Sequence, residues 1–171
     1  MSQAVFGIAD SEARAERIVN DLRAAGFTHD SLSILFPDRT GTHELRHEAH
    51  TKAPEGASAG AGTGALLGGA LGWLSGVGAI AVPGLGAFIA AGPILAALSG
   101  AAAGATVGGI SGALVGYAVP EFEAKQYEDR LRDGNLLISV HTDSVVQQAH
   151  ARDILSRNGA TDISQREEAP V

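Results

Sequence analysis

The sequence contains no cysteine, few aromatic residues and no charge at all over a long central stretch. The absence of cysteine excludes disulfides, thiolate metal sites and thiol catalysis. Aromatic residues make up 5% of the chain, with a single Trp, which is few for an ordinary globular core of this length. From Gly56 to Pro120 there is no Asp, Glu, Lys, Arg or His, so every charge lies outside this stretch.

The charges that are present are mostly acidic. The 171 residues carry a formal net charge of −7, which argues against nucleic acid as a partner, because phosphate binding needs clustered Lys and Arg. A chain of this length forms one domain, or one small domain with an insertion. Residues Met1 to Val5 show neither a basic region nor a long apolar core, so we expect no signal peptide. We expect the protein at the bacterial inner membrane or in the cytoplasm.

Glycine recurs every fourth residue in two series within the uncharged stretch. The series are Gly60, Gly64, Gly68, Gly72 and Gly76, and then Gly100, Gly104, Gly108, Gly112 and Gly116. Residues four apart lie on one side of an α-helix, so each series predicts a helix with a bare stripe. Glycine costs about 1 kcal/mol per helical position relative to alanine, a loss that close packing must offset. Because such repeats associate helices in lipid, we predict that these glycines form an assembly interface.

Two prolines divide the uncharged stretch into two predicted helices. Pro83 and Pro93 indicate helix over about 58–81, a small turn element over 84–89 and helix over about 93–118. We expect the bulkier residues opposite the glycine stripes to form an outward apolar face. These residues are Leu66, Trp73, Val77, Ile80, Val107, Ile110, Leu114 and Tyr117. In a soluble monomer this face would be a large exposed patch, so it must meet lipid or other copies of the chain.

The N-terminal residues predict a strand, a helix and a second strand. The first strand covers Val5 to Ile8, and Asp10 is our choice for the cap of a helix from about Glu12 to Ala25. Gly26 ends this helix, as glycine does at the left-handed position after a helix. Alternating apolar residues then predict a strand over 32–36, which Pro37 closes.

The C-terminal residues repeat this pattern. A strand over 136–140, a helix from about Val145 to Arg157 and Gly159 precede a final extended segment around Ile163. An offset of 133 matches Ser11 with Ser144, and Gly26 with Gly159. Two such units predict an α+β fold, the ferredoxin-like β-α-β-β-α-β sandwich, with its two helices on one face and a helical hairpin inserted between its second and third strands. Coincidence is the alternative, because strand, Asp-Ser, helix and glycine often follow one another.

These patterns give the chain five parts. They are the split α+β domain at 1–37 and 134–165, a polar linker at 38–55, the uncharged glycine hairpin at 56–119, a connector helix at 120–133 and a tail at 166–171. The connector is expected to be a short amphipathic helix that contains Glu121, Phe122, Tyr127 and Leu131 and ends at Gly134.

One segment fits a zinc-protease pattern. His43, Glu44 and His47 match H-E-x-x-H, and His50 lies nearby. The run is short and polar and lacks an apolar face that would bury such a helix, so we interpret it as a solvated linker, with metal binding by His43, His47 and His50 as the alternative. The many Gly-x-Gly spacings lack the preceding strand and the Lys-Ser/Thr of phosphate loops. We assign no catalytic residue and no cofactor.

Three groups of residues support a family resemblance. They are Ala13…Leu22…Ala25-Gly26-Phe27, then Lys52-Ala53-Pro54-Glu55-Gly56, and Val82-Pro83-Gly84-Leu85-Gly86…Ala91-Gly92-Pro93-Ile94. On these residues the chain is similar to the YflT-like general stress protein family of bacteria, over nearly its whole length. The resemblance implies a stress-associated, non-enzymatic role and brings no catalytic residues with it.

Two classes of function remain open. In the first, the protein is membrane-associated, because helices of about 24 residues match a bilayer core. In the second, it is a water-soluble homo-oligomer, a ring, shell or filament, whose hairpins form a shared apolar core. In both classes we expect self-association through the glycine hairpin. We do not expect the protein to be an enzyme.

Overall fold

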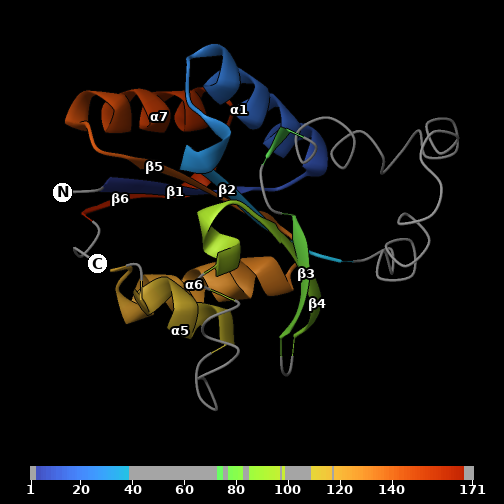
Figure 1. Cartoon of the computed structure of the whole chain (residues 1–171). Coiled ribbons are helices and arrows are strands. Elements are labelled where there is room, and N and C mark those ends of the chain that lie inside the picture. The colour runs from blue at the N-terminus through green and yellow to red at the C-terminus, as the bar shows by residue number, and fades with distance from the viewer. Residues whose placement is uncertain are drawn as a thin grey trace, which may run out of the picture.

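The chain forms a mixed α+β structure around one antiparallel sheet. The computed structural model describes residues 3–38, 73–74, 77–82, 85–96, 98, 109–116 and 118–167. Within these residues six strands lie in the order β3-β4-β2-β5-β1-β6, and every neighbouring pair is antiparallel. Helices cover both faces of the sheet (Figure 1). The predicted α+β class is therefore confirmed.

The N-terminal unit has the predicted order of elements. It contains β1 (Gln3–Ala9), α1 (Glu12–Ala24), a 3-10 turn η1 (His29–Ser31) and β2 (Leu32–Pro37). Our choice of Asp10 as the cap of α1 is wrong, because the Ser11 side chain accepts the hydrogen bond from the Arg14 backbone N–H. Asp10 instead pairs with the Arg14 guanidinium at 2.7 Å.

The C-terminal unit follows the same order. It contains β5 (Leu136–Thr142), α7 (Val145–Arg157) and β6 (Thr161–Glu167). The bounds of α7 are those predicted. Gly26 and Gly159 follow α1 and α7 with φ values of 91° and 77°, so both glycines end helices in the left-handed region as predicted. β6 runs through Glu167, and the first two residues assigned to the tail therefore belong to the sheet.

A β-hairpin occupies part of the stretch for which we predicted helix and turn. β3 (Gly78–Val82) and β4 (Gly86–Ala91) pair with each other, and β4 also pairs with β2. The prediction of helix at 78–81 and of a small turn element at 84–89 is wrong. The four-residue glycine period ends at Gly76, because position 80 is Ile. From there the β-branched residues favour a strand, and pairing with β2 satisfies the backbone of β4.

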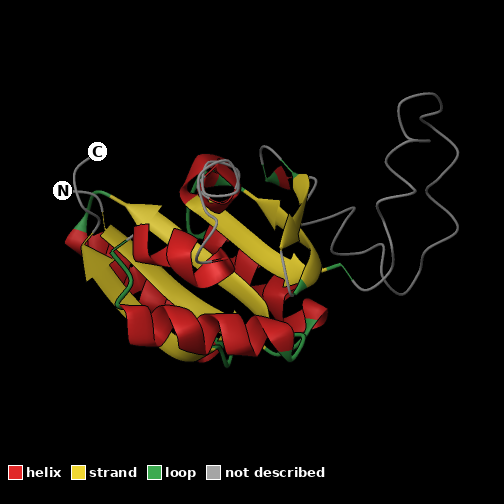
Figure 2. Ribbon diagram, turned by 90° about the horizontal axis from the view of Figure 1, so that it is seen from below, coloured by secondary structure: helices red, strands yellow, loops and turns green. Residues whose placement is uncertain are grey.

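The sheet separates two apolar clusters, because successive side chains of a strand point to opposite faces. On one face Val5, Ile34 and Ile138 pack with residues of α1 and α7. On the other face Phe6, Leu35 and Leu137 pack with residues of α5 (Gly109–Gly116) and α6 (Glu121–Arg132). Figure 1 shows the resulting three layers, helices, sheet and helices, and Figure 2 views the same molecule from below, with helices in front of the strands.

The helix predicted as a connector is part of this second layer. α6 starts after Pro120 and ends before Gly134, whose φ is 95°, close to the predicted bounds. Tyr127 and Leu131 are buried as expected. Phe122 is 80% exposed and lies outside the cluster on the second face of the sheet.

Candidate functional site

Helix α5 has two unlike faces. Ile110 and Leu114 are fully buried in the cluster that α5 and α6 form with the sheet. Gly112 and Gly116 lie on the opposite, exposed side. A methyl group added at Gly116 would meet no atom within 4 Å, and the neighbouring Val115 is 44% exposed. The helix therefore uses its bulky face for its own core and presents backbone to the exterior.

This orientation is the reverse of the predicted one. Ile110 and Leu114 were expected to face outward, and that expectation is wrong. Trp73, Val77 and Ile80 are partly buried against the two clusters and also pack inward. The physical reason is that the second face of the sheet needs an apolar cover, and large aliphatic side chains bury far more area than glycine. Of the predicted outward face, Leu66, Val107 and Tyr117 lie outside the described residues.

Most of the predicted glycine interface also lies outside the described residues. This applies to Gly60, Gly64, Gly68, Gly72, Gly76, Gly100, Gly104 and Gly108. Only Gly112 and Gly116 can be placed, and both are exposed.

A charged contact fixes the direction in which the glycine face points. The backbone N–H of Ser111, in the first turn of α5, donates to Glu128 Oε2 on α6 at 2.9 Å. Glu128 also accepts from Arg132 on its own helix at 3.5 Å. A carboxylate is favourable at a helix N-terminus, where unpaired N–H groups and the helix dipole meet it. α5 is therefore anchored at its start by α6 and along its inner side by the core.

A polar network ties α6 to the outer strand β6. The Tyr127 hydroxyl donates to the Asp162 carbonyl at 2.7 Å and lies 2.8 Å from Ser164 Oγ. Gln126 donates to Asp162 Oδ1 at 2.8 Å, and Arg130 Nε donates to Oδ2 at 2.9 Å. Burial raises the pKa of Tyr127 to about 12, against the opposing effect of the Ser164 hydrogen bond. These residues hold the edge of the sheet in place.

The same two elements share an ion pair between Arg166 and Glu123. Asp162 itself has a φ of 51°, in the left-handed region where non-glycine residues are uncommon. Sequence reasoning missed the network because its members are separated by more than thirty residues along the chain and follow no local motif. The Arg and Glu residues of α6 gave no sign of which strand they would meet.

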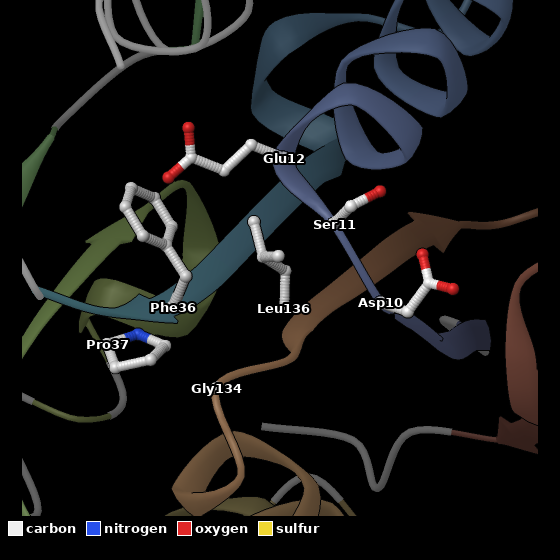
Figure 3. Close-up of a pocket in the computed structure, with 7 residues that line it drawn as sticks. All are labelled: Asp10, Ser11, Glu12, Phe36, Pro37, Gly134 and Leu136. Atoms are coloured by element: carbon white, nitrogen blue, oxygen red, sulfur yellow. The ribbon is translucent and has the colours of Figure 1, made fainter. Parts of the chain in front are cut away.

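A cavity of about 150 Å³ lies where β1 leads into α1. It is lined by Asp10, Ser11, Glu12, Phe36, Pro37, Gly134 and Leu136. Ligand pockets are usually larger, on the order of 300–1,000 Å³. Figure 3 shows the carboxylates of Asp10 and Glu12 pointing away from each other. Asp10 is already paired with Arg14, so the cavity offers no converging set of ligands for a cation.

Two serines and a histidine meet on strands β2 and β5. His141 Nε2 lies 3.0 Å from Ser139 Oγ and 3.4 Å from Ser33 Oγ. Ser33 and Ser139 are 1% and 0% exposed, and Ser33 also accepts from the Ile94 backbone N–H at 3.1 Å. A nucleophilic serine must be reached by its substrate. We therefore interpret these contacts as internal hydrogen bonds that fix the segment around Ile94 to the sheet.

Three further observations bear on function. Across the described parts of the chain, no helix is long and apolar enough to cross a membrane. No cluster of three or more His, Cys, Asp or Glu side chains that could hold a metal ion occurs among the residues that the structure places. The alternative metal ligands His43, His47 and His50 lie outside those residues.

No family model, curated protein or solved structure matches the chain.

Proposed function

We propose that this chain is a non-enzymatic protein that associates with further copies of itself through the glycine face of its uncharged stretch. The two unlike faces of α5 carry this proposal. Ile110 and Leu114 attach the helix to its own sheet, while Gly112 and Gly116 stay exposed. An exposed glycine in a helix costs about 1 kcal/mol relative to alanine, and close contact with another backbone offsets that cost.

We also propose that the α+β part is a ferredoxin-like sandwich that carries an insertion. The strand order β2-β5-β1-β6 with antiparallel neighbours supports it, because β1-α1-β2 and β5-α7-β6 then correspond to the two halves of that fold. The segments between β2 and β5 would be the insertion, and they supply the additional strands β3 and β4 and the second helical layer.

The partner that we propose is a second copy of the chain, with membrane lipid as a further contact. The uncharged stretch from Gly56 to Pro120 supports both. The resemblance to the YflT-like general stress proteins supports a role under stress in a bacterium, at the inner membrane or in the cytoplasm. If lipid is not involved, the alternative is a water-soluble homo-oligomer.

Replacement of the exposed glycines tests the proposal. In the double variant Gly112→Leu/Gly116→Leu, the added side chains should hold neighbouring backbones apart, a change that typically costs about 1–3 kcal/mol. The association constant should fall roughly 5- to 150-fold. Light scattering over a concentration series measures this against the 17.3 kDa mass of one chain. Ala24→Leu, at an exposed position of α1, is the matched control and should keep the wild-type mass.

Equal masses for the wild type and the double variant at every concentration would disprove association through α5. Flotation with anionic vesicles then distinguishes binding to lipid from self-association of the chain. A chain that associates without floating supports the water-soluble alternative.

A further inference from the structure

The two edges of the sheet are built differently. β6, at one edge, carries Asp162, Arg166 and Glu167, and its pairing with β1 shifts register between Phe6 and Ile8. Charges and bulges of this kind keep an edge strand from pairing with another chain. β3, at the other edge, has the sequence Gly-Ala-Ile-Ala-Val, with no charge and no proline, and pairs with β4 without irregularity. Within the described residues, β3 pairs on one side only (Figure 1).

β3 is held in place from inside the molecule. Ile80 packs against the cluster on the second face of the sheet, and Val82 is 7% exposed within it. A methyl group at Gly78 would lie 2.8 Å from Leu95, so the strand and the segment after β4 are in close contact. A strand that is already paired on one side and anchored loses little conformational entropy when another strand pairs with it. Its outer N–H and C=O groups form an ordered template.

We propose that β3 pairs with β3 of a second copy of the chain, antiparallel across a two-fold axis, so that two sheets become one. The sequence of the strand fits itself in this arrangement. With Ile80 on the axis, Ala79 lies opposite Ala81 of the other copy and Gly78 lies opposite Val82. Ile80 lies opposite Ile80 of the other copy at the centre, alanines lie opposite alanines beside it, and the valine at one end lies opposite a glycine. Because β3 carries no charge, two copies meet without the repulsion that like charges opposite each other produce.

This contact deepens the proposed self-association and rests on it, but it uses a different surface. The β3 edge and the exposed face of α5 are each able to join one further copy, and a two-fold contact uses the same surface on both partners. A chain with both contacts assembles beyond a dimer, whereas a chain with one of them stops at a dimer. The masses of variants therefore separate the two proposals.

Charge placed on β3 tests the pairing and its register. In the variant Ala79→Lys/Ala81→Lys, each introduced lysine lies opposite another one, and the assembly should lose its β3 contact. In Ala79→Lys/Ala81→Glu, each lysine lies opposite a glutamate, and the contact should return. The measured molar mass should fall at least two-fold in the first variant and recover in the second. Thr161→Lys/Gln165→Lys places the same charges at exposed positions of β6 and should leave the mass unchanged.

Hydrogen exchange on the unaltered chain gives a second measurement, which holds even where a variant fails to fold. Protection of the amides at 78–82 should increase at least tenfold between dilute and concentrated protein, in step with the molar mass. The inference is overturned if protection at 78–82 is independent of concentration, since another segment of the same chain then covers the edge. It is also overturned if the lysine pair keeps the wild-type mass or if the Lys/Glu pair does not restore it.

Comparison with the glycine variants identifies which proposal fails. If Gly112→Leu/Gly116→Leu lowers the mass and the β3 lysine pair does not, the β3 inference is wrong and the α5 proposal stands. The opposite result would disprove association through α5 and support the pairing of β3. If the wild-type chain keeps the mass of a single copy at every concentration, both proposals are wrong.

Discussion

Individual glycines in this chain meet very different surroundings. Gly92 has a φ of 82°, and a methyl group added there would lie 2.0 Å from the Leu32 carbonyl oxygen. Gly116 lies in a helix with open space around it. The first position requires glycine both for its backbone conformation and for its close approach to another strand. The second requires it only if another molecule packs there.

Alanine at these two positions should therefore change stability in opposite directions. Gly92→Ala should lower the free energy of unfolding by at least about 2 kcal/mol, because a left-handed side chain and a backbone collision both add cost. Gly116→Ala should raise it by up to about 1 kcal/mol, because alanine favours the helix. Urea unfolding of the dissociated chain measures both. A neutral Gly92→Ala would show that the approach of the chain to Leu32 is not maintained in solution.

At the scale of elements, α6 and β6 are joined through the Tyr127 hydroxyl. Burial holds the pKa of Tyr127 at about 12, above the usual value of 10. The folded chain then binds this proton more tightly than the unfolded chain does. The stabilisation is complete below pH 10 and is lost as the pH rises from about 10 to about 12.

Tyr127→Phe should remove this dependence on pH. The variant loses the bonds to Asp162 and Ser164 and should be less stable at pH 8 by about 1–3 kcal/mol. Between pH 10 and pH 12 the stability of the variant should fall less than that of the wild type. The difference between the two decreases should reach roughly 2–3 kcal/mol over this range. Thermal unfolding as a function of pH, recorded for both proteins, measures the difference. Parallel curves would mean that Tyr127 is not buried as a neutral phenol.

Elements with local signals were predicted well, and elements set by distant partners were not. α1 with its Gly26, α7 with its Gly159 and the alternating strands each depend on residues close in sequence. The prediction missed β3 and β4. Residues around Ile80 form a strand because β4 pairs with the edge of β2 and β3 pairs with β4. No residue close to Ile80 in the sequence indicates this pairing. The prediction of which face of α5 points outward was wrong for a similar reason. Ile110 faces inward because a second sheet face needs cover, and the sequence pattern alone fits either orientation.

For the whole molecule, the residues of the uncharged stretch that the structure describes contribute to the core of the α+β part. Phe88, Ile110 and Leu114 come from this stretch and cover Phe6 and Leu35 of the α+β part. The two matched β-α-β units by themselves predict that the two halves fold together without residues 56–119. The shared cluster changes that expectation, because removal of these residues would uncover one face of the sheet.

Replacement of residues 56–119 by a short Gly/Ser linker should therefore abolish cooperative thermal unfolding. Phe6, Leu35 and Leu137 would become exposed on the face that α5 and the β3–β4 hairpin now cover, a loss of several kcal/mol at about 25 cal/mol per Å². Circular dichroism melting measures the result. Replacement of residues 41–53 of the predicted polar linker by Gly/Ser of equal length is the control and should keep a sharp transition. A cooperative transition in the shortened chain would show that α6 covers the second face unaided.

The position of β1 in the sheet also has a consequence for the order of events during synthesis. β1 lies between β5 and β6, and Gln3 pairs with Thr142 and Glu167. A ribosome adds roughly 5–20 residues per second, so β1 waits roughly 8–30 s until both of its neighbours have been synthesised. Through that interval Phe88, Ile110 and Leu114 have no complete sheet to cover. Their burial is therefore one of the last steps of folding, because it needs strands from both ends of the chain.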